Sequence, residues 1–311
     1  MPKPGPLRVR VVNWRESPRP CYACRMSAPH ARACPACGHD TARFAFETAG
    51  YVHVRCERCD TLFVAELPSA ERVEATYLAP DYHSSAIGQE QRMRAEADAR
   101  AHVLRKFGCR DILEIGCGPG HFLDAVRDLG MQIEGVDRAP SAEAARARGH
   151  TVHDVWLQDL EPVSPRFDAV AMWEVIEHVG DPAAILQRVR QWLRPGGFLA
   201  LSTPSSSGIP ARVLGSRFPM VCPPEHLTLF SRKGLGALLI GAHFDPVRWT
   251  SFSGLGREQL RRGFQRFLLG GSLPGRAVAS GLAAVAELPV QLMDRAGLGS
   301  GFEVYSVATP D

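Results

Sequence analysis

Residues 111–120 read Asp-Ile-Leu-Glu-Ile-Gly-Cys-Gly-Pro-Gly, the most informative segment of the chain. The first half is a short apolar run of the kind that forms a buried parallel strand. The closely spaced glycines that follow favour a tight turn, because glycine adopts positive φ without a steric penalty. From His121 onward the apolar residues take a helical spacing. The segment therefore predicts a strand, a tight turn and a helix whose N-terminus points at a ligand.

A second strand end completes this prediction. Residues 133–137, Ile-Glu-Gly-Val-Asp, read as a strand that ends in the carboxylate of Asp137. This carboxylate follows the glycines by about twenty residues, the spacing at which an acidic residue accepts hydrogen bonds from the ribose hydroxyls of a nucleoside. Together the two segments predict a nucleoside-cofactor site.

The glycine spacing indicates which cofactor this is. A dinucleotide site has the pattern Gly-x-Gly-x-x-Gly, whereas this chain has Glu114 followed by Gly116, Gly118 and Gly120. The pattern Glu-x-Gly-x-Gly-x-Gly resembles motif I of the class I S-adenosylmethionine-dependent methyltransferases, whose cofactor carries a sulfonium and an amino acid in place of phosphates. The alternative, a plain glycine turn in another α/β protein, is disfavoured by the spacing to Asp137.

The resemblance implies S-adenosyl-L-methionine as the cofactor. Residues of the glycine loop and of the following strand ends are expected to bind it: Glu114, Gly116, Cys117, Gly118, Gly120, Asp137, Leu157 and Trp173. Leu157 and Asp159 are both candidates to border the adenine. For Trp173 two interpretations stay open, packing on the cofactor and packing in the core.

From residue 110 onward, strands and helices alternate, which is typical of a doubly wound sheet. Strands are expected near 110–115, 131–137, 151–155, 167–173, 197–203, 244–250 and 302–308. The clearest helix, Ala183–Leu193, is closed by Pro195-Gly196-Gly197. The predicted fold is α/β, a seven-stranded doubly wound Rossmann-like sheet. Its last strand resembles the antiparallel final strand of the class I methyltransferases.

Ahead of this sheet lie three Cys-x-x-Cys pairs: Cys21/Cys24, Cys34/Cys37 and Cys56/Cys59. The second and third pairs flank a hairpin (43–46 and 51–55) that brings them together. Four thiolates in a tetrahedron form a closed structural zinc site, which stabilises a module with too small a core of its own. A second metal on the first pair, with His30 or His39, is disfavoured.

The chain is therefore divided into four parts. They are an N-terminal arm (1–20), a zinc-ribbon module (21–66), a helical linker that covers the cofactor (67–108) and a methyltransferase domain (109–311). Long insertions near 204–232 and 254–300 are expected to form lids or substrate walls. The linker contains helices over 69–77 and 89–107. The arrangement resembles a ribbon-bearing bacterial subgroup of methyltransferases, and this resemblance implies that Tyr77 and Tyr82 close over the methionine end of the cofactor.

The segment after the strand at 167–173 carries the candidate chemistry. Residues 173–182, Trp-Glu-Val-Ile-Glu-His-Val-Gly-Asp-Pro, resemble a segment of the ubiquinone-type O-methyltransferases and of a small-RNA 2′-O-methyltransferase family. The resemblance implies a second metal site for Mg²⁺ or another divalent ion, with Glu174, Glu177, His178 and His226 as ligands. Alternatively, the Glu and His side chains only brace the turn between strand and helix.

Transfer of a methyl group from a sulfonium to a hydroxyl requires a base. His226 is the first candidate, since it lies in the insertion that is expected to cover the pocket, and His178 is the second. In the same insertion, Ser231 is expected to cap the following helix. Neither Cys117 nor Cys222 has an evident base partner, so no nucleophilic cysteine is expected.

Composition narrows the function further. The chain has 311 residues, 45% of them hydrophobic, and a net charge of +3 spread along its length, which argues against nucleic-acid or membrane attraction. The N-terminus lacks the apolar core of a signal peptide, which favours a cytoplasmic protein. In that compartment, nine cysteines favour metal ligands and isolated thiols over disulfides. We expect a methyltransferase for a small molecule, with O-methylation favoured. The alternatives are C- or N-methylation of a metabolite or nucleotide-linked sugar, and RNA or protein methylation with the ribbon as the recognition module.

Overall fold

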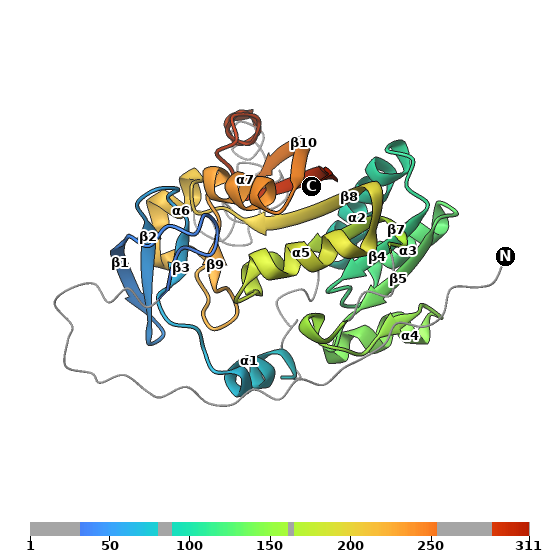
Figure 1. Ribbon diagram of the computed structural model, residues 1–311, viewed down its shortest axis with the longest axis horizontal. Helices are drawn as coiled ribbons and strands as arrows, with labels where there is room; N and C mark the ends of the chain where they lie inside the picture. The colour runs from blue at the N-terminus through green and yellow to red at the C-terminus, as the bar shows by residue number, and fades with distance from the viewer. Residues whose placement is uncertain (1–31, 80–88, 161–164, 254–287, 311) are drawn as a thin grey trace, which may run out of the picture.

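The computed structural model describes residues 32–79, 89–160, 165–253 and 288–310. Its main feature is a seven-stranded sheet with the order β10-β11-β8-β7-β4-β5-β6 (Figure 1). The strands are β4 (Asp111–Ile115), β5 (Gln132–Val136), β6 (Val152–His153), β7 (Phe167–Trp173), β8 (Leu193–Pro204), β10 (Phe244–Phe252) and β11 (Gly301–Ala308). β11 runs antiparallel to both β8 and β10, whereas the pairs among β4 to β8 are parallel. The predicted fold class is confirmed.

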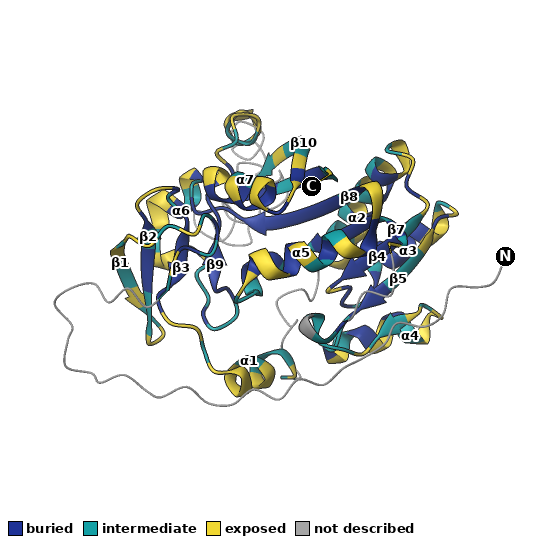
Figure 2. Cartoon of the chain, viewed as in Figure 1, coloured by how far each residue is buried: buried dark blue, intermediate teal, exposed yellow. Residues whose placement is uncertain are grey.

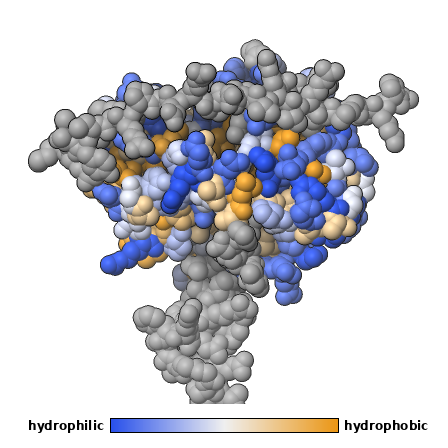
Figure 3. Space-filling view, turned by 90° about the horizontal axis from the view of Figure 1, so that it is seen from below, coloured by the Kyte–Doolittle hydropathy of each residue, from blue (hydrophilic) through white to orange (hydrophobic). Residues whose placement is uncertain are grey.

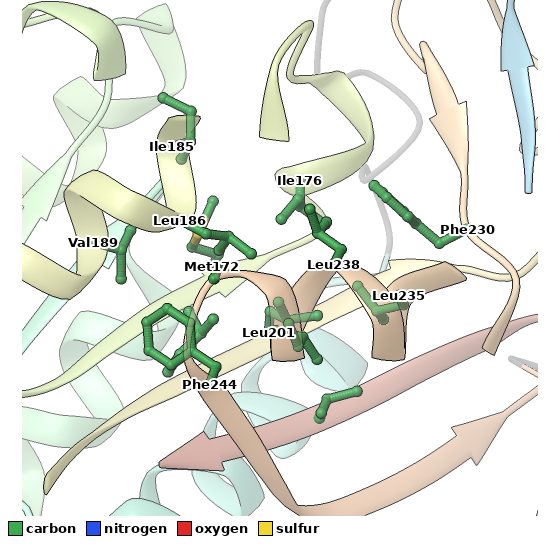
Figure 4. Packing of buried hydrophobic residues seen from close by; sticks show 14 of the residues in the cluster. Met172, Ile176, Ile185, Leu186, Val189, Leu201, Phe230, Leu235, Leu238 and Phe244 are labelled. Carbon is green, nitrogen blue, oxygen red and sulfur yellow. The ribbon is translucent and has the colours of Figure 1, made fainter. Parts of the chain in front are cut away.

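Helices cover both faces of this sheet. α2 (Glu90–Lys106) and α3 (His121–Asp128) bury apolar residues on one face, and α5 (Pro182–Trp192) and α7 (Arg232–Gly241) do so on the other. Figure 4 shows the second face, where Leu235 and Leu238 of α7 approach Leu201 of β8. Shorter helices are α4 (Glu143–Ala147), α6 (Ile209–Leu214) and the 3-10 turns η2 (Pro140–Ala142), η3 (Leu157–Asp159), η4 (Ile176–His178) and η5 (Gly215–Arg217).

The cysteine hairpin forms a second sheet, with the order β1-β2-β3-β9. Its strands are β1 (Ala42–Thr48), β2 (Tyr51–Cys56), β3 (Leu62–Val64) and β9 (Thr228–Leu229). The fourth strand comes from the insertion expected at 204–232, and it pairs Leu229 with Leu62 and Thr228 with Phe63. One hydrophobic cluster runs from Cys59 and Phe63 of the ribbon to the residues that pack on the large sheet. The ribbon and the large sheet therefore share a core.

Helix α1 (Ala70–Tyr77) follows the ribbon and buries none of its residues completely. It lies below the large sheet and is largely exposed (Figure 2). Ser69 caps it by accepting a hydrogen bond from Arg72 N. The predicted helices at 69–77 and 89–107 are thus present as α1 and α2.

Some predictions fall outside the described residues. These are the N-terminal arm, the Cys21/Cys24 pair, His30, Tyr82 and most of the insertion at 254–300. Among the residues that are described, no helix combines the length and the apolar character that a membrane crossing requires. On the face drawn in Figure 3, hydrophobic and hydrophilic residues are intermixed.

Candidate functional site

A cleft of about 2360 Å³ lies at the carboxyl ends of the central strands. Ligands of open α/β sheets bind at this edge. Its walls include residues of the glycine loop, Asp137, Trp173, His178 and His226. The structure thus brings the predicted catalytic residues and the predicted cofactor residues, apart from Gly120, to the lining of one cleft.

The glycine loop takes the conformation that its sequence requires. Gly116, Gly118 and Gly120 have φ values of 72°, 47° and 81°. A Cβ on Gly116 would lie 2.6 Å from a methyl carbon of Val175, and one on Gly120 would lie 2.7 Å from Ala145 Cβ. Gly120 also occupies the N-cap position of α3. Larger residues at these two positions would therefore force the loop or its neighbours to move.

Asp137 holds the loop from the neighbouring strand. Its Oδ2 accepts a hydrogen bond from Gly118 N at 2.7 Å, and its Oδ1 accepts one from Ala139 N at 2.6 Å. A carboxylate oxygen has more than one acceptor site, so both oxygens can also accept from ribose hydroxyls. The carboxylate is therefore oriented by the protein and fits a nucleoside.

Glu114 lies at the inner end of β4 and is 3% exposed. Its Oε2 has no hydrogen-bond partner within the described part of the chain. Burial, together with the negative charge of Asp137, raises the pKa of Glu114 well above its ordinary value, while Arg100 opposes this shift. A buried, unpartnered carboxylate oxygen is costly. A ligand with an ammonium group, such as the expected cofactor, fits this position.

Arg100 is a site residue that sequence reasoning missed. Its guanidinium carbon lies 4.3 Å from the ring centroid of Trp173, and its Nε donates to Glu303 Oε2 at 2.9 Å. All three residues line the cleft. Nothing in the sequence marks this residue among the arginines of α2, because its partners lie on distant strands.

Trp173 satisfies parts of both interpretations left open by the sequence. The ring packs edge-on against Phe122 at 5.3 Å and Tyr305 at 6.3 Å, so it belongs to the core. It also lines the cleft, and its Nε1 is buried with no hydrogen-bond partner among the described residues. The ring of Trp173 therefore lies between the core and the cleft.

The expected adenine side is formed by the turn after β6. Leu157 begins η3 and lines the cleft next to Trp156. The ring of Trp156 lies 4.9 Å from the guanidinium of Arg138 and 6.1 Å from the ring of Tyr77. Tyr77 also lies 5.7 Å from His178, so the end of α1 lies between the predicted adenine side and a predicted catalytic histidine.

Three of the four predicted ligands of the second metal lie together. One donor atom each of Glu177, His178 and His226 lies within 4.8 Å of the other two. Glu177 is fully buried, and its Oε2 accepts from Thr203 Oγ1 at 3.0 Å. Its Oε1 has no partner within the described residues. Burial and the neighbouring Glu174 raise the pKa of Glu177 well above its usual range, so this carboxyl group suits a cation or a bound proton.

The two histidines are oriented in the same way. His178 Nδ1 lies 2.8 Å from the carbonyl oxygen of Glu225, and His226 Nδ1 lies 2.8 Å from that of Met220. A carbonyl only accepts, which assigns the proton to Nδ1 and the lone pair to Nε2 in each neutral ring. Metal-binding histidines are commonly held by such bonds. Burial lowers the pKa of His226 and favours the neutral ring.

Glu174, the remaining predicted ligand, is not in this group of three. Its φ of 54° is unusual for a residue other than glycine, and its backbone N donates to the carbonyl and the hydroxyl of Ser202. The side chain reaches the water of the cleft, yet the surrounding protein desolvates it and raises its pKa. Strained backbone of this kind is concentrated at functional sites.

The predicted zinc ligands also lie together. Cys34 Sγ and Cys59 Sγ are 3.6 Å apart, and Cys37 Sγ and Cys56 Sγ are 3.6 Å apart. A tetrahedral zinc with bonds of about 2.3 Å has sulfur atoms about 3.8 Å apart. The four thiols therefore fit a structural zinc ion.

Comparisons with known proteins agree with this arrangement. Residues 85–248 match the family model described as a methyltransferase domain. A ubiquinone biosynthesis O-methyltransferase of Cereibacter sphaeroides (strain ATCC 17025 / ATH 2.4.3) is 30% identical over 185 residues, which cover 51% of this chain and 74% of that protein. One of Xanthomonas campestris pv. campestris (strain B100) is 38% identical over 101 residues, or 30% of this chain and 42% of that protein.

A solved structure shows the same fold. It is a complex between the Haloferax volcanii Trm112 methyltransferase activator and a methyltransferase. Its TM-score is 0.53 at 17% identity, with 78% of this chain and 99% of that chain covered. With the glycine loop, Asp137 and the seven-stranded sheet in place, the chain belongs to the methyltransferase domain family and is an S-adenosylmethionine-dependent methyltransferase.

Proposed function

We propose that the protein transfers the methyl group of S-adenosylmethionine to a hydroxyl oxygen of a small molecule. One observation carries this proposal. Two oriented imidazoles line the cleft that also contains the glycine loop, and the buried carboxyl group of Glu177 lies beside them. An oxygen acceptor needs such groups, because its proton must be removed as the methyl group arrives.

The described residues that suit each part of the cofactor follow from their charge or their apolar character. Asp137 is suited to the ribose hydroxyls, and Leu157 to the adenine. Glu114 is suited to the ammonium of the methionine part and Arg100 to its carboxylate. When bound, the cofactor supplies a methyl group on a good leaving group, so the protein mainly orients and desolvates the acceptor.

His226 is the proposed proton acceptor. Its neutral ring has the lone pair on Nε2, and its Nδ1–H is fixed by the Met220 carbonyl. His178, whose ring centroid lies 4.7 Å from that of His226, is the second candidate. In this role the hydroxyl proton passes to an imidazole nitrogen.

A divalent ion is the second use that this group supports. Glu177, His178 and His226 would hold it, and it would supply a positive charge that lowers the pKa of the acceptor hydroxyl. Two nitrogen donors favour a first-row transition ion over Mg²⁺, which prefers oxygen ligands. A histidine that binds the ion through Nε2 cannot also accept the proton there, so the two uses make different predictions.

Two further observations favour a small acceptor. Apolar side chains that line the cleft include Leu214, Phe218, Met220 and Phe252. The relatives named ubiquinone biosynthesis O-methyltransferase have a small-molecule acceptor by name. We therefore propose an apolar or aromatic hydroxyl compound as the acceptor, and a structural zinc ion in the ribbon.

The test uses the full-length protein and S-adenosylmethionine with a tritiated methyl group. Label should enter catechols and phenols but not matched amines, and mass spectrometry should place the new methyl group on oxygen. His226→Gln should lose this transfer, whereas His102→Gln, on the exposed side of α2, should retain it. Transfer to nitrogen or carbon instead of oxygen would contradict the proposal.

A further inference from the structure

The ribbon contacts the candidate catalytic group through the backbone around Leu227. Val64 N, at the end of β3, donates to the carbonyl of Leu227 at 3.0 Å. Leu227 N in turn donates to the carbonyl of Glu177 at 2.9 Å. Leu227 directly follows His226. The backbone beside His226 is thus held between a ribbon strand and the turn that carries Glu177.

Arg32 makes a parallel connection. Its Nε donates to the carbonyl of Val64 at 3.1 Å, and its Nη1 donates to the carbonyl of Gly180 at 3.0 Å. One guanidinium therefore joins the end of β3 to the loop that follows His178. Its fork geometry suits such a two-point contact.

Thr61 connects the third cysteine pair to the start of α7. The Thr61 side chain is fully buried. Its Oγ1 lies 3.3 Å from Cys59 Sγ and accepts a hydrogen bond from Ser231 N at 3.3 Å. The Ser231 hydroxyl donates to the carbonyl of Cys59 and accepts from Gly234 N at 2.8 Å as the N-cap of α7. A zinc-bound thiolate at Cys59 would accept the Thr61 proton and leave the oxygen lone pairs for Ser231.

Gly234 shows how closely α7 approaches the third cysteine pair, Cys56/Cys59. A Cβ at this position would collide with Thr61 Oγ1 and would lie 3.2 Å from Cys59 Sγ. The flanking Phe230 and Leu235 belong to the hydrophobic cluster that also contains Cys59 (Figure 4). The interface between the third cysteine pair and α7 is packed on both sides of the Thr61 contact. Movement of this cysteine pair must therefore move the first turn of α7.

From these contacts we infer that the cysteine ribbon is a positioning element of the methyl-transfer site, and that Thr61 is its positioning residue. The ribbon fixes β9 and the first turn of α7, and these fix the backbone at His226 and Glu177. The cofactor half is separate in this respect, because β4 and β5, which lead to Glu114 and Asp137, pair with neither β3 nor β9. The catalytic meaning of the inference rests on the proposed function, but the coupling itself does not.

The test compares Thr61→Val, which removes the hydroxyl at nearly constant shape, with Thr61→Ser, which retains it. Thr41→Val is the matched control, since Thr41 is exposed on the same ribbon and its hydroxyl bonds to His39. Zinc content and S-adenosylmethionine affinity are measured first. Amide hydrogen exchange is then followed in peptides covering 222–234 and, as the reference, 110–137.

Thr61→Val should keep its zinc and its cofactor affinity, and exchange in 222–234 should rise about tenfold, the effect of one lost buried hydrogen bond. Thr61→Ser should restore the slow exchange, and Thr41→Val should not alter it. Gly234→Ala, which strains the same contact from α7, should act like Thr61→Val.

Exchange at the wild-type rate in 222–234 would overturn the inference. An equal rise in 110–137 would also overturn it, because the effect would then be a general loss of stability. Neither readout requires the methyl acceptor. A wrong assignment of O-methylation would therefore leave this result unchanged, and the two proposals fail independently.

Discussion

The imidazole rings of His178 and His226 lie 4.7 Å apart at an interplanar angle of 74°, and each donates its Nδ1–H to a backbone carbonyl. The two rings come from different segments, the turn after β7 and the loop before β9. Neither ring is free to rotate without losing its carbonyl bond. This fixed geometry would suit the proposed acceptance of a proton or a metal ion, and the first two predictions test it.

His226→Gln should lower the rate of methyl transfer by about 10²–10⁴-fold, the usual contribution of a general base. Cofactor binding should stay within twofold of wild type, since His226 is not among the residues proposed to hold the cofactor. Burial lowers the pKa of His226, so the base stays neutral to lower pH than an exposed histidine. The acid limb of kcat/KM should therefore fall below about pH 6.5, the ordinary histidine value. An acid limb above this value would contradict the assignment.

Glu177→Gln should show whether Glu177, His178 and His226 bind a metal ion or whether the histidines act only as bases. The Gln carbonyl can still accept from Thr203, so the fold is retained, but the anionic donor is lost. Binding of Mn²⁺ or Co²⁺, measured by titration calorimetry on protein with intact zinc, should weaken about 100-fold or more. The control is Glu143→Gln, an exposed carboxylate on α4. If wild type binds no ion beyond the ribbon zinc, the histidines act as bases only.

Asp137→Ala should weaken S-adenosylmethionine binding by about 100-fold or more. The variant loses the ribose acceptors and leaves the amides of Gly118 and Ala139 without their partner, a cost of about 2–4 kcal/mol. Titration calorimetry with the cofactor and its demethylated product measures this directly. Asp128→Ala, on the exposed side of α3, should bind like wild type. Equal affinity in both variants would place the cofactor elsewhere.

Asp168→Asn should lower the stability of the fold at neutral pH by about 1–2 kcal/mol. Burial opposes ionisation of Asp168, but hydrogen bonds from the backbone amides of Asp111 and Arg110 and from the Arg194 side chain outweigh it and lower the pKa. A carboxylate with a depressed folded-state pKa stabilises the protein above its unfolded-state pKa of about 3.9. It loses that contribution as the pH falls through the folded-state pKa. Urea unfolding of wild type and variant should therefore differ at pH 7 and converge below about pH 3. A difference that is constant with pH would contradict this account.

The sequence predicted the central sheet well because local signals specify it. The strand at 167–173 is predicted with the bounds of β7, and Ser231 caps α7 as expected. Apolar runs, glycines and a capping serine each act within a few residues. Two strands differ clearly from the prediction. The strand expected at 151–155 is only β6, Val152–His153. β8 begins at Leu193 and so contains Pro195-Gly196-Gly197, and a register shift between Phe167 and Ala169 of β7 accommodates the extra residues.

The contacts across the chain were not predictable in this way. β9 has only two residues, Thr228 and Leu229, and a two-residue strand has no periodicity to detect. Arg100 donates a hydrogen bond to Glu303, which lies 203 residues later in the chain. No local pattern distinguishes Arg100 from the other residues of its helix. The grouping of Glu177, His178 and His226 was anticipated through a resemblance, since spacing alone does not bring residue 226 next to the turn at 176–178.

The insertion contributes β9 to the sheet of the ribbon, and this pairing affects the order in which the protein folds. The ribbon cysteines are synthesised early, but the sheet they support gains its fourth strand only after residue 229 has been made. Long-range pairing of this kind is slow, because a large loop must close before the contact forms. During synthesis β3 is therefore an open edge, and edge strands are prone to pair with other chains. We expect the isolated N-terminal part of this protein to aggregate. We also expect the ribbon to complete its folding together with the cleft beside it.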